Sequence, residues 1–428
     1  MKALVVGSGG REQAIAWKVA QSPLVESIYL APGNGGKLEK CQNIALNVSD
    51  FESVAQFIQK ENIQLVIIGP EQPLVEGIVD YLRSVQGLEK LHIIGPTKAA
   101  AMLEGSKDFA KAFMERYHIP TAKYRTFTKE TLEEGLAYLE HEEKAPYVLK
   151  ADGLAAGKGV VILETLEEAK KEMREMLSGK FGSAGASVVV ETYLKGIECS
   201  VFVLTDGQDY LLLPCAKDYK RIGEGDTGLN TGGMGAVSPV PFVDDQFLEK
   251  VEERIIRPTI EGIKAEGLDY KGFIFAGLMN VNGDPYVIEY NCRMGDPETE
   301  VVMLRIESDL VPALLALRDQ RLKEIPSLKL SHQVATTVVA VSQGYPNDYE
   351  KGKSISGLDE SIPHSYVFHM GTKDADGSTQ TNGGRVLAIS ALGDTLPEAL
   401  NRSYKRLQAI QYEGKTFRRD IGQDLLKL

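Results

Sequence analysis

Cysteine is scarce in this chain of 428 residues, which contains four: Cys41, Cys199, Cys215 and Cys292. No two of them stand in a CxxC spacing, and the six histidines show no spacing typical of metal ligands. These spacings argue against a zinc site or a redox-active cysteine pair. We therefore expect reduced, partly buried thiols and a cytoplasmic protein.

Long apolar runs and an excess of positive charge are also missing. The sequence has no run of about 18 apolar residues, so we expect no membrane span. The N-terminus turns polar after four apolar residues, which is too short for the core of a signal peptide. The net charge of −12 argues against binding nucleic acid through bulk electrostatics. It leaves anionic small molecules open as substrates, because local lysines decide their binding.

The hydrophobic pattern predicts a mixed α/β and α+β protein. Over roughly the first hundred residues, short apolar runs alternate with helical patterns and turns, which is typical of a small parallel sheet. From about Thr121 strands and helices come in mixed order, and after Pro326 the chain predicts a β-rich terminal domain. Helices are predicted over Thr131–Glu143, Leu166–Ser178, Asp245–Glu266 and near Leu396–Ile410.

Two glycine-rich stretches predict loops. Arg221–Pro239 predicts a long loop, and loops of that length are usually functional or disordered. Phe181–Ser187, FGSAGAS, predicts a mobile loop because its residues are small.

The stretch KADGLAAGKGV, Lys150–Val160, suggests a phosphate loop but does not fit the P-loop pattern. A P-loop has four residues between its glycines and a Ser or Thr after the lysine. Here three residues separate Gly153 from Gly157, and Gly159 follows Lys158. The spacing therefore argues against a P-loop of that class and leaves open which kind of phosphate loop this is.

The first strand runs into GSGGRE, which only partly fits a dinucleotide fingerprint. The third glycine would fall on Glu12, and no acidic residue ends the second strand. Gly9, Gly10 and Arg11 at a helix start suit a single phosphate instead, because helix amides and a guanidinium both favour an anion. A tight turn that binds nothing is the alternative. The neighbouring PGNGG turn, Pro32–Gly36, favours a site.

VIEYNCRMGDPETE carries the strongest local pattern. On a strand, Glu289, Asn291 and Arg293 share one face. A carboxylate and an amide oxygen two residues apart suit Mg²⁺ held together with nucleotide phosphates, whereas the alternative is a solvated strand face. Gly295, Asp296 and Pro297 follow directly and predict a turn of defined shape, which favours the metal site over a solvated strand face. Glu191 and Glu198 form a second pair, for which a site and two half-exposed carboxylates are equally good interpretations.

The order of these motifs resembles one family over nearly the whole chain. GSGGRE, PGNGG, GPEQPL, GPTKAAAMLEGSK, KADGLAAGKGV, TGGMGAVSP, NCRMGDPETE, TNGGRVLAIS and FRRDIG are together similar to the phosphoribosylamine–glycine ligases of the ATP-grasp superfamily. The resemblance implies an N-terminal parallel α/β domain on the phosphoribosylamine side, a two-subdomain ATP-grasp core and a small C-terminal β-rich α+β domain. We expect them over residues 1–104, 105–326 and 327–428, with a mobile lid subdomain at about 121–192.

The resemblance also implies an activity. The family joins glycine to 5-phosphoribosylamine in purine synthesis, with ATP as co-substrate and Mg²⁺ (or Mn²⁺) as cofactor, through glycyl phosphate. We therefore expect small-molecule substrates and a monomer. Another ATP-grasp ligase or carboxylase of purine synthesis, and a non-catalytic nucleotide-binding descendant, are the alternatives.

The same resemblance implies residue roles. The ATP contacts would be Lys107, Lys150, Lys158, Glu191, Tyr193, Leu194 and Glu198. The metal ligands would be Glu289 and Asn291, and the catalytic glycine site would be lined by Asp218, Arg293 and Asp296. Phosphoribosylamine would meet Gly9, Gly10, Arg11 and Asn34. Gln13 and Tyr219 stand where the family usually has histidine, which puts the strength of substrate binding in question.

Overall fold

The N-terminal part is a parallel α/β layer, as the sequence predicts. The computed structural model describes residues 1–155 and 159–427, so the predicted ATP contact Lys158 lies outside the described residues. The parallel sheet has the order β3-β2-β1-β4-β5. Its strands are β1 (Lys2–Gly7), β2 (Ser27–Pro32), β3 (Cys41–Asn43), β4 (Leu65–Ile68) and β5 (His92–Ile94).

Helices surround this sheet, and the first of them starts at a switch in strand order. They are α1 (Gly10–Ala20), α2 (Phe51–Glu61), α3 (Glu71–Glu76), α4 (Ile78–Ser84) and α5 (Lys98–Gly105). Strand β1 pairs with β2 on one side and β4 on the other, so α1 leaves the sheet where ligands of open α/β sheets usually bind. Gly7 has φ +131°, and a Cβ there would lie 2.4 Å from the Glu12 side chain, so this turn requires glycine.

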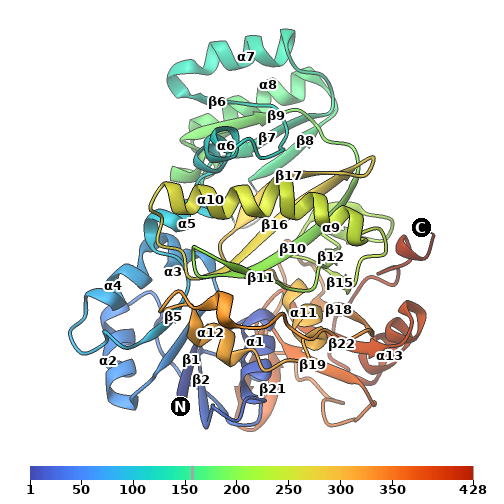
Figure 1. Ribbon diagram of the computed structural model, residues 1–428. Helices are drawn as coiled ribbons and strands as arrows, with labels where there is room; N and C mark the ends of the chain where they lie inside the picture. Colours follow the sequence, from blue (N-terminus) through green and yellow to red (C-terminus); the bar gives the residue numbers. More distant parts are fainter. Residues whose placement is uncertain (156–158, 428) are drawn as a thin grey trace.

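The lid region is a separate small unit at the top of Figure 1. Helix α6 (Lys107–Arg116) leads into an antiparallel sheet of order β6-β9-β7-β8. Its elements are β6 (Tyr124–Thr128), α7 (Leu132–His141), β7 (Tyr147–Ala151), β8 (Val160–Leu163), α8 (Leu166–Glu175), a π-helical turn (Met176–Lys180) and β9 (Ser187–Glu191). Phe127, Leu139, Leu149 and Met173 belong to a core cluster separate from that of the rest of the molecule.

The second half of the predicted ATP-grasp region is an antiparallel sheet of order β11-β10-β16-β17. Its strands are β10 (Ile197–Thr205), β11 (Tyr210–Leu212), β16 (Gly272–Val281) and β17 (Asp284–Asn291). The predicted helix Asp245–Glu266 is present as α9 (Asp245–Val251), a π-helical turn (Glu252–Ile256) and α10 (Arg257–Ala265), which Figure 1 shows lying across this sheet.

The glycine-rich stretch Arg221–Pro239 is not one long loop, so that prediction is wrong. It contains the hairpin β13 (Arg221–Gly223) and β14 (Thr227–Asn230), and then β15 (Gly235–Ser238). Strand β15 is buried because it pairs with β18 (Val334–Ser342), about a hundred residues further along the chain. A partner that distant leaves no local signal in a stretch of small residues.

The predicted β-rich terminal domain closes the molecule. Its sheet has the order β12-β15-β18-β22-β19, and β23 pairs with β18. The remaining elements are β12 (Lys217–Asp218), α11 (Glu298–Arg305), α12 (Val311–Ala316), β19 (Ser365–His369), β20 (Thr372–Ala375), β21 (Ser378–Thr381), β22 (Arg385–Gly393), α13 (Leu396–Ala409) and β23 (Lys415–Thr416), with short 3₁₀ turns at Lys129–Thr131, Gly182–Gly185, Leu322–Glu324 and Leu425–Lys427.

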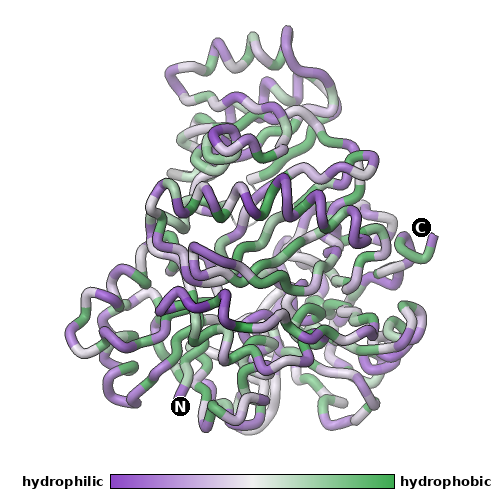
Figure 2. The backbone as a smooth tube through the Cα atoms, in the orientation of Figure 1, coloured by the Kyte–Doolittle hydropathy of each residue, from purple (hydrophilic) through white to green (hydrophobic). Residues whose placement is uncertain are grey.

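One continuous core joins the parallel sheet, the β11-β10-β16-β17 sheet and the terminal sheet, whereas the lid unit has a core of its own. The continuous core runs from β1 through β10 and β16 to β18 and β22, and Figure 2 shows hydrophobic residues concentrated along these central strands. Among the described residues, no helix has the length and apolarity that crossing a membrane requires.

Candidate active site

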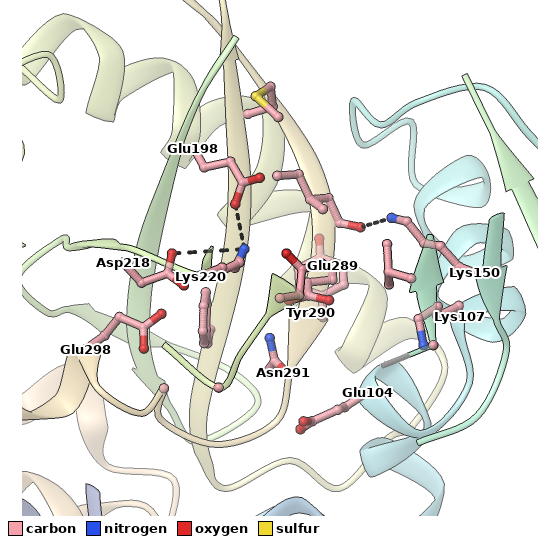
Figure 3. Close-up of a pocket in the computed structure, with 18 of the residues that line it drawn as sticks. Glu104, Lys107, Lys150, Glu198, Asp218, Lys220, Glu289, Tyr290, Asn291 and Glu298 are labelled. Carbon is pink, nitrogen blue, oxygen red and sulfur yellow. Dashed lines mark hydrogen bonds and ion pairs between the residues drawn. The ribbon is translucent and has the colours of Figure 1, made fainter. Parts of the chain in front are cut away.

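A cavity of about 920 Å³ lies between the lid sheet, the antiparallel sheet and the start of α11. It brings together residues that the sequence predicts from six separate stretches. Those on its wall are Arg11, Lys107, Lys150, Glu191, Tyr193, Leu194, Glu198, Asp218, Glu289, Asn291, Arg293 and Asp296. Gly9, Gly10 and Asn34 are not among the residues that line it. Figure 3 shows the centre of this cavity.

The predicted phosphate lysines lie on one side of the cavity. Lys150, on β7, is buried, and its Nζ lies 2.8 Å from Glu191 Oε1 and donates to the Ile288 carbonyl at 3.3 Å. Lys107, the first residue of α6, donates to the Gly153 carbonyl at 3.3 Å. Burial lowers the pKa of Lys107. Both ammonium groups lie beside oxygen acceptors at the cavity wall, where they are placed to meet an anion.

Lys111 is a cavity residue that the sequence reasoning missed. Its Nζ lies 3.2 Å from Glu191 Oε2, and burial lowers its pKa to about 8. The signal was present, because Lys107 and Lys111 are four residues apart and share one face of α6.

The two glutamates that the sequence left open are both paired with lysines. Glu191 is buried, and its two oxygens face Lys150 and Lys111. The Glu191 carboxylate is therefore occupied by these two ammonium groups, and the Thr192 amide that follows donates to the Lys123 carbonyl at 2.9 Å. Glu198 lies 2.5 Å from Lys220 Nζ, and that ammonium holds the pKa of Glu198 below its usual range.

The predicted metal ligands Glu289 and Asn291 end strand β17 and point into the cavity in Figure 3. Tyr290 between them is buried, and its hydroxyl lies 2.6 Å from Thr259 Oγ1 on α10. Burial alone would raise the pKa of Glu289, but nearby lysines, Lys220 foremost, hold it below its usual range. An ionised carboxylate beside an amide oxygen fits a hard divalent cation. No group of three or more His, Cys, Asp or Glu among the described residues could hold a metal, so phosphate oxygens would have to complete the shell.

Arg293 does not continue the strand, so its predicted place on the strand face is wrong. Strand β17 ends at Asn291. The Arg293 guanidinium lines the cavity but pairs with Glu71 Oε2 at 3.2 Å through Nε and with Glu104 Oε1 at 2.8 Å through Nη2. Its fork is therefore engaged by two carboxylates of the N-terminal part.

Asp218 and Glu298 lie on the opposite side of the cavity from Lys107 and Lys150 (Figure 3). They are close enough that the charge of one affects the other. Burial raises the pKa of Asp218. Glu298, the first residue of α11, was missed although it lies within the quoted motif GDPETE. Burial, reinforced by Asp218, raises the pKa of Glu298 to about 8.

The start of α1 already meets carboxylates. The Gly9 amide donates to Glu12 Oε2 at 2.7 Å, and the Arg11 amide donates to Asp296 Oδ2 at 3.3 Å. Asp296 also pairs with Arg385 Nη1 at 2.9 Å. Asn34 donates through Nδ2 to the carbonyls of Ser8 and His369. The predicted phosphoribosylamine contacts and the predicted glycine contact Asp296 therefore adjoin one another.

The two departures from the family pattern are both buried structural residues. Gln13 is 1% exposed, accepts a hydrogen bond from the His369 amide and donates to Asn34 Oδ1 at 3.4 Å. Tyr219 is 2% exposed and donates to Asp424 Oδ1 at 2.5 Å. Tyr219 is not among the residues that line the cavity.

A cavity between two antiparallel sheets, lined by both lysines and carboxylates, is the arrangement of an ATP-grasp protein. Family models of phosphoribosylglycinamide synthetase match its N domain at residues 1–104, its ATP-grasp domain at residues 105–299 and its C domain at residues 335–424. The chain therefore belongs to the phosphoribosylglycinamide synthetase family.

Individual relatives agree over the full length. The chain is 50% identical over 428 residues to phosphoribosylamine–glycine ligase of Escherichia coli strain K12, covering 99% of this chain and 98% of the relative. It is 49% identical over 426 residues to that of Pasteurella multocida, covering 99% and 97%. A crystal structure of phosphoribosylamine–glycine ligase from Thermotoga maritima matches with a TM-score of 0.84 and 35% identity, over 98% of this chain and 100% of that one.

Proposed function

We propose that the chain catalyses the ATP-dependent ligation of glycine to 5-phosphoribosylamine, giving glycinamide ribonucleotide, ADP and phosphate. The observation that carries the proposal is a cavity in which Asn291 and the ionised Glu289 lie between Lys107 and Lys150 on one side and the buried acids Asp218 and Glu298 on the other. Family membership over all three matched domains supports the same reaction.

The nucleotide would enter between the lid sheet and the antiparallel sheet. Lys107 and Lys150 would meet its phosphates, and the backbone of residues 192–194 would meet the adenine. Glu198 would meet the ribose, once Lys220 turns from it toward the transferring phosphate. Phosphoryl transfer needs mainly positioning and neutralised charge, which these lysines supply.

A divalent metal, Mg²⁺ or Mn²⁺, would be held by Glu289 and Asn291 and would neutralise phosphate charge. Glycine's carboxylate would attack the γ-phosphate to give glycyl phosphate, and the amine of phosphoribosylamine would then displace phosphate. Closure of the lid would keep water from this acyl phosphate.

Phosphoribosylamine would approach from the start of α1, past Arg11 and Asp296. Because Asp296 reaches the Arg11 amide, the second substrate would arrive beside the activated glycine. Gly9, Gly10 and Asn34 would act through the turns that they shape, and a phosphate there would displace the carboxylates now bound to the Gly9 and Arg11 amides.

Two alternatives lose support. Family membership disfavours another purine ligase or carboxylase. A non-catalytic descendant was favoured only by Gln13 and Tyr219, and both are packed away from the cavity. The domain boundaries near residues 104 and 326, a monomeric state and a cytoplasmic location stay predictions from the sequence.

The test is ADP release by the full chain. ADP should form only when glycine, phosphoribosylamine, ATP and Mg²⁺ are all present. Glu289→Ala should reduce the rate at least tenfold and require more Mg²⁺, because a metal ligand is lost, whereas Glu249→Ala, an exposed carboxylate on α9, should match the wild type. ADP release that ignores either glycine or phosphoribosylamine would reject the proposed reaction, and an unchanged Mg²⁺ requirement in Glu289→Ala would reject the metal site.

A further inference from the structure

The chain that carries Asp218 and Lys220 presents two different faces. It starts with β12 and stays paired with β15 beyond it, because the Tyr219 amide donates to the Gly235 carbonyl at 3.0 Å. Alternate side chains of such a chain share a face. Asp218 and Lys220 share the face that lines the cavity, where Lys220 Nζ lies 4.0 Å from Asp218 Oδ1. Lys217 and Tyr219 share the other face, with Lys217 Nζ 3.9 Å from the centre of the Tyr219 ring.

A C-terminal segment covers this second face. We call residues Arg418–Asp424 the tail. Asp424 accepts from the Tyr219 hydroxyl through Oδ1 at 2.5 Å, and its Oδ2 lies 3.2 Å from Lys217 Nζ. Burial raises the pKa of Tyr219, so its hydroxyl keeps the proton that it donates. One carboxylate therefore binds both side chains of the second face.

The other end of the tail holds the hairpin that follows. Arg418 is 2% exposed, and its Nη1 donates to Asp226 Oδ1 at 2.7 Å and to the Arg221 carbonyl at 3.1 Å. Asp420 accepts from the Gly225 amide through Oδ2 at 2.7 Å. Arg418 and Asp420 also pair with one another, at 2.7 Å between Nη2 and Oδ2. The tail therefore contacts this part of the chain both before and after the cavity residues.

The tail itself is fixed to the terminal domain. Ile421 is buried, and its amide donates to the hydroxyl of Tyr404 on α13 at 3.3 Å. A Cβ at Gly235 would lie 2.9 Å from Ile421 Cδ1, so Ile421 packs directly against β15, the strand that pairs with β12. Asp424 thus projects from a packed support rather than from a loosely held segment.

We propose that the tail is a positioning element of the active site, in which Asp424 holds the chain that carries Asp218 and Lys220. The proposal rests on the proposed function, since there Lys220 meets the transferring phosphate. Phosphoryl transfer depends on the placement of charge, and a small displacement caused far from the reacting atoms can slow it greatly. Lys107 and Lys150, which would hold the ATP phosphates, lie on α6 and β7. Losing the tail contact should therefore slow the reaction more than it weakens ATP binding.

The experiment measures kcat and the KM for ATP by ADP release from the full chain. Asp424→Ala removes both contacts of the carboxylate, so kcat should fall at least tenfold while the KM for ATP changes less than twofold. Asp424→Asn keeps an oxygen for the Tyr219 hydroxyl but no charge for Lys217, so it should lose less. Gln423→Ala, at an exposed neighbour in the same tail, is the matched control and should match the wild type.

A double-mutant cycle separates positioning from direct contact with a substrate, because Asp424 also lines the cavity. Tyr219→Phe removes one hydroxyl from a residue that is not among the cavity residues. It should lower kcat at least threefold, and Asp424→Ala should then cost less in the Tyr219→Phe background than it costs alone. If Tyr219→Phe is as fast as wild type and Asp424→Ala costs the same in both backgrounds, the positioning role is overturned.

Two further measurements separate the reaction from the fold. Calorimetric titration with Mg²⁺ and a non-hydrolysable ATP analogue counts the folded sites in each variant, and a fall in kcat that only follows this count would overturn the proposal. If Asp424→Ala fails to fold, Asp424→Asn takes its place in the cycle, and additive effects there overturn the proposal. Wild-type ADP release that ignores glycine or phosphoribosylamine would reject the proposed function, whereas a normal wild type with no change in any Asp424 or Tyr219 variant would reject the positioning role alone.

Discussion

Among single residues, Arg293 lines the cavity, but its charge is used to hold two parts of the fold together. Its guanidinium joins Glu71 at the start of α3 to Glu104 in α5, while Glu104 also accepts from the Cys292 amide at 2.8 Å. These contacts connect the end of β17 to the N-terminal layer. A guanidinium makes both contacts because its donors form a planar fork, which an ammonium cannot reproduce.

We predict that Arg293→Lys acts mainly on stability. Losing one arm of a buried pair should lower the free energy of unfolding by about 1–3 kcal/mol. The KM values for glycine and ATP should then rise together, because the whole cavity wall shifts. Thermal melts and both KM values check this, with Arg254→Lys at an exposed pair with Asp284 as the matched control. A normally stable variant in which only the glycine KM rises would return Arg293 to the role of a direct glycine contact.

The same scale marks a limit of what the sequence can predict. Strand spacing predicted the cavity residues Glu289 and Asn291, because alternate side chains of a strand share one face. Lys150 was implied by the family resemblance. Gln13 bonds to His369, 356 residues away in sequence, and Tyr219 bonds to Asp424, 205 residues away. Such partners come from the tertiary fold, so no local pattern could distinguish a packed Gln13 from one that meets a phosphate.

Among elements, the lid unit was the most predictable and β15 the least. The strands and helices of the lid follow one another closely in sequence, and their apolar residues form their own core. Strand β15 depends on β12 and β18 for every ladder contact. The helix predicted over Asp245–Glu266 contains Pro258, which in the structure lies at the start of α10, directly after the π-helical turn.

The lid has a hydrophobic core of its own, so we expect it to move as a unit relative to the rest of the molecule. The segment Phe181–Ser187, within the lid, allows this to be tested. Lys180 offers trypsin a cleavage site directly before this segment. Mg²⁺ with ATP should slow cleavage after Lys180 at least fivefold. Trypsin cuts a segment that unfolds locally, and a ligand that closes the lid makes this local unfolding rarer. Cleavage after Lys351, an exposed site in the C-terminal domain, is the internal control. Mass spectrometry of the fragments measures both, and equal slowing at the two sites would indicate general stabilisation rather than lid closure.

At the scale of the whole molecule, the acidic residues of the active site lower the stability of the folded protein. Buried carboxyls gather around the cavity, and burial raises the pKa of Asp218, Glu298 and Glu300. A carboxyl whose pKa is raised by folding binds its proton more tightly in the folded state than in the unfolded chain. The acidic side of the cavity should therefore make the free protein less stable as pH rises.

Glu298→Gln isolates this cost in the free protein. Below a pH of about 4.5, Glu298 carries its proton in both states, so it adds no penalty. As pH rises toward 8, the unfolded chain loses the proton and the folded chain keeps it, so wild type loses stability by up to roughly 1.4 kcal/mol per pH unit. The Gln variant has no proton to lose, so its unfolding free energy should exceed that of wild type by a margin that widens from pH 5 to pH 8. Urea unfolding at both pH values measures the margin, with Glu249→Gln as the exposed control. A margin that is the same at pH 5 and pH 8 would mean that Glu298 is already ionised in the empty cavity.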